Sequence, residues 1–444
     1  MKKIAILVFF TVGFFVHVWA CTGLIAGKQA TVDGSVLVTY SADSHTLYGA
    51  LTSSPAADWP KGSMRSIVEW DTNKPLGEIE QVEHTYAVMG NMNEHQLTVV
   101  ESTWGGRPEL VDTTGIIDYG SLMQLALERA KTAREAIKVM TGLVKKYGYY
   151  SSGESFTIAD PNEAWILDLI GKGPGRRGAV WVAVRIPDDC IAGHANYPRI
   201  HKIPMDDKEN CLYSPDVISF AREMGYFDGL NKDFSFADAY APADFGALRA
   251  CDARVWSFFR KYDSTMDNYL PYVNGESAEP FPLYVKPSRK LSVQDMKEAM
   301  RDHFEDTPFD MTQDVGAGPF KVPYRFRPMS FEVDGKSYCM ERAIATQQTG
   351  FTLVGQMRNW LPDPVGGVLW FGVDDANTCV YIPMYCGITQ VPECFSPENG
   401  SMYDFSWTSA FWIHNWVANM AYARYEPMIG DIRKVQSAVE TSLN

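Results

Sequence analysis

The sequence from residue 21 to residue 40 reads CTGLIAGKQATVDGSVLVTY, and this stretch gives the clearest indication of the fold. Two apolar runs, 23–27 and 35–40, flank Asp33-Gly34, a dipeptide typical of tight turns. This pattern predicts a β-hairpin. Cys21 stands immediately before the first strand of that hairpin.

The twenty residues before Cys21 have the order of a secretory signal peptide. A basic start (Lys2, Lys3) is followed by the apolar run 4–16 and by Val18-Trp19-Ala20, with Val18 and Ala20 at small-residue spacing. A membrane-spanning helix needs about 20 apolar residues, so the short run favours a removable signal over a permanent anchor. We therefore expect cleavage after Ala20 and an exported protein, periplasmic or extracellular, in which residues 21–444 form one domain.

Composition narrows the class of protein. With 46% apolar and 13% aromatic residues, the chain can bury a large core, and its net charge of −14 makes nucleic acid an unsuitable partner. Three of its eight cysteines, Cys379, Cys386 and Cys394, lie in one short segment, where a disulfide is expected after export. A metal site there is the weaker interpretation, because there is no Cys-x-x-Cys motif and no histidine at ligand spacing.

The pattern along the rest of the chain alternates strands and helices. Strand-like runs occur at 86–89, 97–101, 155–159, 164–169, 180–186, 351–356, 367–373 and 378–383. Helical periodicity covers 119–147 as a helix pair, 248–262, 293–302 after Ser292, and the aromatic-rich segment 408–425. We expect an α+β fold in which helices cover two stacked antiparallel sheets.

The position of Cys21 has a chemical consequence. Once it is the first residue, its own α-amine, with a pKa near about 7.7 to 8.0, can take the proton of a thiol whose pKa is about 8.5. Such a nucleophile needs no histidine. The competing interpretation is a lipid-attachment cysteine, against which Trp19 argues. A papain-like mechanism using His194 and Asn196 is a further rival, but it requires an internal cysteine.

Short motifs that match one known family recur along almost the whole chain. They are Cys21-Thr22, Gly27-Lys28, Asp33-Gly34-Ser35, Asp43-Ser44, Gly90-x-x-Asn93-Glu94, Glu101-Ser102-Thr103, Gly105-Gly106-Arg107, Glu154-Ser155, Ala159-Asp160, Glu163-Ala164-Trp165, Trp181-Val182-Ala183, His194-Ala195-Asn196, Gly367-Val368-Leu369-Trp370 and Ser409-Ala410-Phe411-Trp412. In these motifs the sequence resembles the dipeptidase A family of cysteine peptidases, in the choloylglycine-hydrolase-like branch of the N-terminal nucleophile hydrolases.

The resemblance implies a four-layered αββα sandwich and hydrolysis of dipeptides through an acyl-enzyme, without metal or cofactor. It assigns Cys21 as nucleophile, Asp43 as the acid that holds the amine, and Asn93 and Asn196 as oxyanion donors. It also suggests, through a looser match, a role for Arg254. The sequence departs from the family where Tyr40 replaces an arginine.

Because a tyrosine cannot supply a fixed positive charge, the Tyr40 departure leaves the substrate open. Two alternatives to a dipeptidase follow: an N-acyl amide hydrolase of the bile-salt or acyl-amino-acid type, and a lipid-anchored binding protein without activity. His45 is interpreted as a solvated loop residue. The aromatic residues of 407–425 are expected to pack in the core, with an aromatic substrate subsite as the alternative.

Overall fold

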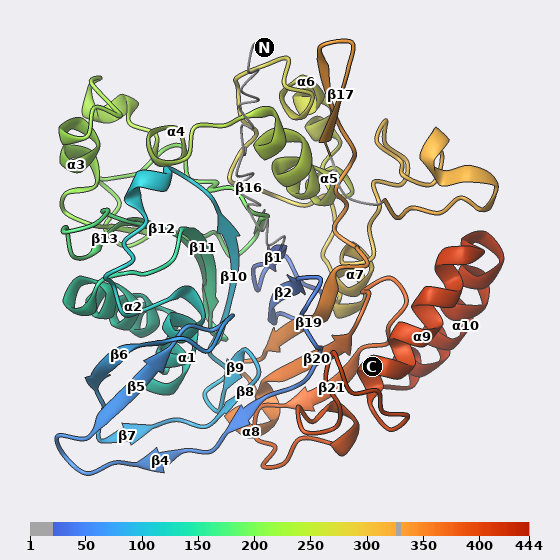
Figure 1. The fold of residues 1–444 in the computed structure, drawn as a ribbon, viewed down its shortest axis with the longest axis horizontal. Coiled ribbons are helices and arrows are strands. Elements are labelled where there is room, and N and C mark those ends of the chain that lie inside the picture. Colours follow the sequence, from blue (N-terminus) through green and yellow to red (C-terminus); the bar gives the residue numbers. More distant parts are fainter. Residues whose placement is uncertain (1–20, 326–329, 444) are drawn as a thin grey trace, which may run out of the picture.

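A computed structural model describes residues 21–325 and 330–443, so the expected signal peptide lies outside the described residues. The hairpin predicted from residues 21–40 forms the centre of the first of two large sheets (Figure 1). This sheet is antiparallel. Its strands, in spatial order, are β16 (Tyr284–Val285), β14 (Ile191–His194), β1 (Gly23–Ala26), β2 (Val36–Asp43), β19 (Thr349–Met357), β20 (Val368–Val373) and β21 (Ile382–Tyr385).

The second sheet is also antiparallel and contains most of the remaining predicted strands. In spatial order it consists of β15 (Cys211–Tyr213), β13 (Ala179–Ile186), β12 (Ala164–Gly171), β11 (Gly153–Ala159), β10 (Thr98–Trp104), β9 (Met92–Asn93), β8 (Val88–Met89) and β3 (Ser53–Ser54). Strand β10 packs across β1 and β2 of the first sheet.

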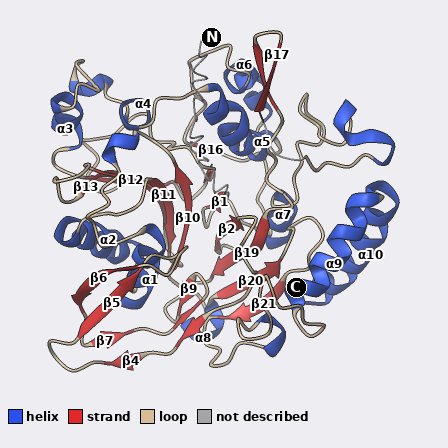
Figure 2. Cartoon of the chain, viewed as in Figure 1, coloured by secondary structure: helices blue, strands red, loops and turns tan. Residues whose placement is uncertain are grey.

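Side chains alternate between the two faces of each sheet, as strand geometry requires. On β2, Val38 and Tyr40 point into a core that the two sheets share, whereas Leu37 points to the opposite, helix-covered face. On β10, Val100 joins the shared core and Val99 packs beneath helices. The order of layers is therefore helices, sheet, sheet and helices (Figure 2). The expected α+β class is confirmed.

The predicted helix pair is α1 (Tyr119–Arg129) and α2 (Ala133–Tyr147), which cover the second sheet. The Asp118 and Thr132 side chains accept hydrogen bonds from the first-turn N–H groups and so fix where these helices begin. The first sheet is covered by α5 (Ala253–Arg260) and α7 (Val293–Ala299), the latter begun by a Ser292 and Asp295 capping box.

Further helices complete the chain. They are α3 (Val217–Glu223), α4 (Phe236–Tyr240), α6 (Leu270–Val273), α8 (Asp363–Gly366), α9 (Ala410–Ala423) and α10 (Tyr425–Leu443). A π-helical segment, Ala247–Asp252, runs directly into α5, so the helix predicted over 248–262 is present and begins as a π-helix. Within the described ranges, none of the helices is both long and apolar enough to cross a membrane.

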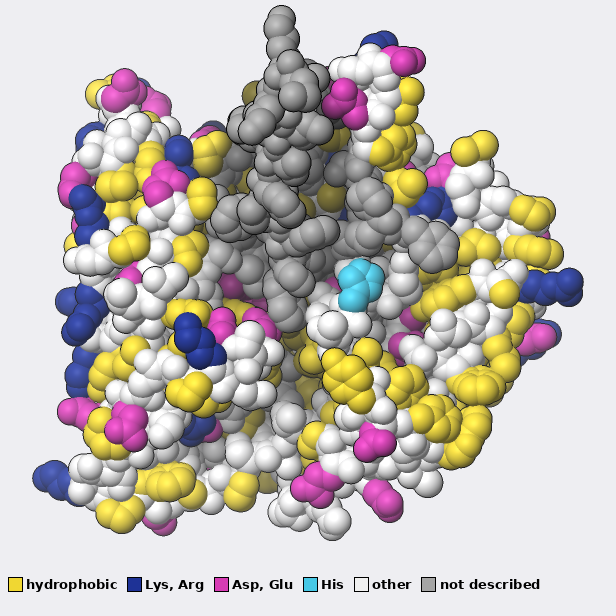
Figure 3. Space-filling model, viewed as in Figure 1, with side chains coloured by type: hydrophobic (Ala, Val, Ile, Leu, Met, Phe, Trp, Pro, Cys, Tyr) yellow, Lys and Arg dark blue, Asp and Glu magenta, His cyan; other side chains and the backbone are white. Residues whose placement is uncertain are grey.

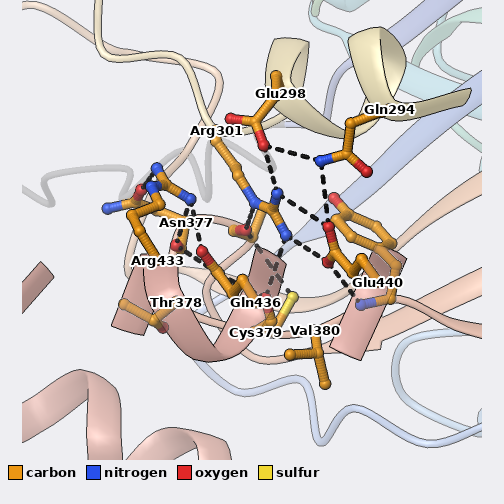
Figure 4. Close-up of polar contacts among 12 residues, drawn as sticks. Gln294, Glu298, Arg301, Asn377, Thr378, Cys379, Val380, Arg433, Gln436 and Glu440 are labelled. Carbon is orange, nitrogen blue, oxygen red and sulfur yellow. Dashed lines mark hydrogen bonds and ion pairs between the residues drawn. The ribbon is translucent and has the colours of Figure 1, made fainter. Parts of the chain in front are cut away.

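Helix α10 was not predicted, and a buried polar network attaches it to the first sheet (Figure 4). Glu440 Oε1 pairs with Arg301 Nη2 at 2.6 Å and accepts the backbone N–H of Tyr381 at 3.1 Å. Gln436 Nε2 donates to the carbonyl of Cys379 at 2.7 Å. Because removal of one partner from a buried ion pair costs about 3–5 kcal/mol, loss of either Arg301 or Glu440 alone should loosen α10 from the sheet.

Several expectations about local structure need correction. Cys379, Cys386 and Cys394 are separate thiols, so the predicted disulfide is wrong. The strand predicted at 378–383 begins only at Ile382. Short ribbons between 57 and 85 and between 330 and 339 were not predicted. They are β4 (Ala57–Asp58), β5 (Met64–Val68), β6 (Pro75–Glu80), β7 (His84–Thr85), β17 (Ser330–Val333) and β18 (Lys336–Cys339).

Candidate active site

A cavity of about 210 Å³ lies where the two sheets and the first turns of α1 meet. The first sheet contributes Cys21 and Tyr40 to its wall, the second sheet contributes Glu101, and α1 contributes Tyr119. Asp71, from the turn that follows β5, also lines it. The lining contains three carboxylates, and no lysine, arginine or histidine of the described chain is part of it.

Cys21 is held in this cavity by the hairpin. Thr22 pairs with Ser41, so the Cys21 side chain points to the same face of the sheet as Tyr40, and the thiol is 4% exposed. Burial raises the pKa of the Cys21 thiol well above its usual value, and the negative charges of Glu101 and Asp43 raise it further. Hydrogen bonds from the Asp43 backbone and the Tyr40 hydroxyl oppose these effects only in part. The thiol therefore needs a base before it can attack.

Arg254 connects the nucleophile to a second candidate residue. It is 1% exposed, and its Nη1 donates to the carbonyl oxygen of Cys21 at 2.8 Å and to Thr22 Oγ1 at 2.7 Å. Its Nη2 donates to Asn196 Oδ1 at 2.8 Å. The structure thus brings Arg254, Cys21 and Asn196 together, as expected from the sequence. The Asn196 backbone has a positive φ of 57°, and its Nδ2 donates to the carbonyl of Thr103 at 2.5 Å.

Asp43 ends strand β2 beside Cys21 and is also fully enclosed. Its Oδ1 accepts the Thr349 hydroxyl at 2.6 Å, and its Oδ2 pairs with Arg342 Nη2 at 2.6 Å. The sequence analysis missed Arg342, which lies 299 residues along the chain in an irregular segment with no motif to mark it. The Arg342 guanidinium therefore supplies a positive charge next to Asp43, which the tyrosine at position 40 cannot do.

Tyr40 is bonded to a buried acid. Its hydroxyl donates to Glu101 Oε1 and lies 3.7 Å from the Cys21 sulfur. Burial, with the charges of Cys21 and Glu101, raises the pKa of Tyr40 well above its usual value, so the phenol stays protonated. In place of the arginine that the resemblance implies, the cavity therefore holds a neutral donor and a carboxylate.

The expectation for Asn93 does not agree with the structure. Asn93 Nδ2 donates to the carbonyls of Leu127 and Ala130, and its Oδ1 accepts the N–H groups of His95 and Leu97. All of its polar atoms thus fasten the β9 turn to the end of α1, away from the cavity. Its neighbour Asn91 lines the cavity instead, with Nδ2 donating to the Val99 carbonyl at 3.0 Å. The motif around Gly90 could not distinguish these two asparagines.

The chain's relatives identify the class of enzyme to which this site belongs. The model of a family described as peptidase family C69 matches residues 20–438. The chain belongs to peptidase family C69. The resemblance to the dipeptidase A family and the expectation of a cysteine-type dipeptidase enzyme are thereby confirmed.

Several similar proteins align with most of this chain. A probable dipeptidase of Latilactobacillus sakei is 24% identical over 91% of this chain and 82% of its own length. A probable dipeptidase of Salmonella dublin is 26% identical over 83% of this chain and 81% of its own length. Dipeptidase A of Lactobacillus helveticus is 24% identical over 91% and 82%, respectively.

In this C69 family member the rival thiol–histidine arrangement finds no support. His194 is fully buried, and its Nδ1 and Nε2 are bonded to the hydroxyls of Ser102 and Thr157 at 2.6 and 2.8 Å. Burial, assisted by the charge of Arg254, lowers the pKa of His194 to about 3. Both ring nitrogens are occupied by hydroxyl partners rather than by the thiol. His45 is exposed in the loop after Asp43, as expected.

The aromatic helix of this peptidase is only partly a core helix. Phe411 is buried, and its ring packs at a tilt against Tyr48, which lines the cavity. Trp416, in contrast, is 49% exposed and contacts the exposed Trp407. Figure 3 shows apolar side chains gathered over α9 on this face. The expectation that these aromatic residues pack in the core is therefore correct for Phe411 and wrong for Trp416.

Proposed function

We propose that this C69 family member is an exported dipeptidase of the N-terminal nucleophile type, in which Cys21 is the first residue of the mature chain. The observation that carries the proposal is the surroundings of the Cys21 thiol. Two carboxylates raise its pKa, and the described lining of the cavity offers no histidine or lysine as base. An α-amine on Cys21 itself would fill that role.

The proposed reaction follows from this geometry. The α-amine takes the thiol proton, and the sulfur attacks the carbonyl carbon of the peptide bond, forming a tetrahedral oxyanion. The resemblance assigns the donation to that oxygen to Asn196, whose Oδ1 accepts from Arg254 and whose Nδ2 also donates to the Thr103 carbonyl. As the intermediate collapses, the ammonium gives its proton to the leaving nitrogen, and a thioester remains on Cys21. Water, deprotonated by the same amine, then releases the acid.

Asp43 and Arg342 have a supporting role in this scheme. Asp43 accepts from Thr349 and Arg342, and the resemblance assigns to its carboxylate the holding of the mature amine. A single fixed position for that amine would keep it directed at the thiol in both halves of the reaction. The layer order of helices, two sheets and helices, with the nucleophile before a central strand, supports an N-terminal nucleophile hydrolase sandwich.

The size of the cavity favours a short peptide. Pockets that enclose drug-sized ligands usually measure about 300–1,000 Å³. The 210 Å³ at Cys21 suit a dipeptide better than a conjugated bile acid. The relatives named dipeptidases agree with this size.

Release of free amino acids from dipeptides by the exported protein tests the proposal. Cys21→Ala should abolish hydrolysis, provided that the mature N-terminus is verified. Cys211→Ala, which removes another buried thiol on edge strand β15, should retain activity. Full activity in Cys21→Ala, or a lipid-acylated α-amine on an active wild-type protein, would contradict the proposal.

A further inference from the structure

The charges around the cavity are unbalanced. Of its three carboxylates, Asp43 is paired with Arg342, and Asp71 accepts the Tyr119 hydroxyl at 2.8 Å. Glu101 is the third and is only 2% exposed. Its Oε1 accepts from Tyr40, but its Oε2 has no hydrogen-bond partner among the described residues. A buried carboxylate oxygen in that condition is costly unless a donor reaches it, either the protonated Glu154 beside it or a group in the cavity.

Glu154 is the second buried acid here; it lies on the neighbouring strand β11, opposite Thr103 and diagonal to Glu101. Both Glu154 side-chain oxygens are buried, and its side chain has hydrogen-bonding contact with Glu101 and Thr103. Burial, and then the negative charge of Glu101, raise the pKa of Glu154 well above its usual value. Glu154 is thus a neutral acid that donates toward Glu101, and Glu101 is the acid of the pair that lines the cavity.

We propose that Glu101 binds the α-ammonium group of the residue whose carbonyl is attacked, so that the enzyme cleaves only peptides with a free amino end. This inference rests on the proposed function and specifies its substrate class. In such a peptide the α-nitrogen is two bonds from the scissile carbonyl carbon. The Tyr40 hydroxyl lies 3.7 Å from the Cys21 sulfur and is bonded to Glu101, so a carbonyl at the thiol brings its ammonium to this carboxylate.

The same geometry gives a reason for Tyr40. An arginine at this position would place a positive charge beside Glu101. A tyrosine orients the carboxylate without neutralising it, and the charge remains for the substrate. An N-acyl amide would bury Glu101 without a cation. Sites built for a polar group discriminate against analogues that lack it by about 10⁴-fold in kcat/KM.

Three substrates test the assignment on the exported, processed enzyme: alanyl-alanine, its N-acetyl derivative, and lactoyl-alanine, in which a hydroxyl replaces the ammonium. We expect wild type to prefer alanyl-alanine strongly. Glu101→Gln keeps the shape and an acceptor for Tyr40 but removes the charge, so kcat/KM for alanyl-alanine should fall about 100-fold. Its kcat/KM for lactoyl-alanine should stay constant or rise, and the preference should shrink accordingly.

Glu154→Gln is the matched control. It changes the adjacent buried glutamate, but it replaces one neutral group by another, so the preference for a free amine should persist. An unchanged preference in Glu101→Gln, or an equal loss in Glu154→Gln, would overturn the assignment while the dipeptidase proposal stands. Failure of wild type to cleave any of the three substrates would instead overturn the proposed function.

A measurement on wild type alone guards against a misfolded variant. If Glu101 binds the ammonium form, kcat/KM should fall at high pH as the substrate amine loses its proton. The midpoint should follow the amine pKa across dipeptides that differ in that pKa. A midpoint that is the same for all of them would overturn the assignment.

Discussion

Replacement of Arg254 by lysine tests how the nucleophile is held in place. Arg254 donates five hydrogen bonds, to Cys21 O, Thr22 Oγ1, Ala195 O, Asn196 Oδ1 and Ala250 O. A lysine has three donors, so at least two of these buried acceptors lose their partner. At about 1–3 kcal/mol for each unsatisfied group, the free energy of unfolding should fall by about 2–6 kcal/mol.

Most proteins are stable by about 5–15 kcal/mol, so Arg254→Lys should still fold. Its kcat should fall by about 100-fold, because Cys21 and Asn196 lose the group that fixes their positions. Urea unfolding and dipeptide hydrolysis measure the two effects. The partly exposed Arg260, which pairs with the exposed Asp267, provides the control Arg260→Lys, expected to change stability by less than about 0.5 kcal/mol. Equal stability and equal kcat in Arg254→Lys and wild type would refute the reasoning.

Three further predictions concern individual residues. Asn93→Ala removes four buried hydrogen bonds and should lower the urea midpoint while the folded fraction keeps its kcat; a selective loss of kcat would restore the oxyanion role. Partial desolvation, opposed by the Tyr119 hydrogen bond, raises the pKa of the surface-facing Asp71 to about 6, above its unfolded value, so wild type should lose a small part of its stability as pH rises from about 4 to 6. Asp71→Asn should therefore be more stable than wild type at pH 7.5 but not at pH 3.5, and a difference independent of pH would contradict this. His194→Gln should leave the acidic limb of the kcat/KM profile in place, whereas a thiol–histidine mechanism predicts loss of activity.

The regular elements were predictable because each leaves a local signal. The Asp33-Gly34 turn, the strand-like runs that form β11 to β13 and the periodicity of α1 and α2 all depend on neighbours within a few residues. Helix α10 has only a few buried residues, and its attachment depends on Glu440 meeting Arg301 from far along the chain. No local pattern contains that contact.

In the candidate site, too, only the residues that carry a local signal could be predicted. Cys21 has a position relative to the signal sequence, and Asp43, Asn196 and Arg254 lie in matching motifs. Arg342, which reaches Asp43 from an irregular segment, and the Glu101 charge opposite Tyr40 arise only when distant strands meet. The error at Asn93 has the same origin, because a motif cannot show whether an amide turns toward a cavity or toward a helix end.

The mass of the N-terminal peptide tests the central claim most directly. Exported wild-type enzyme, mixed with a dipeptide and quenched rapidly in acid, should yield a peptide that begins at Cys21 and carries the first amino acid of the substrate as a thioester. The same peptide without substrate should have a free α-amine. An active enzyme that retains residues before Cys21, a lipid on its α-amine, or an acyl group on any other residue would contradict the account.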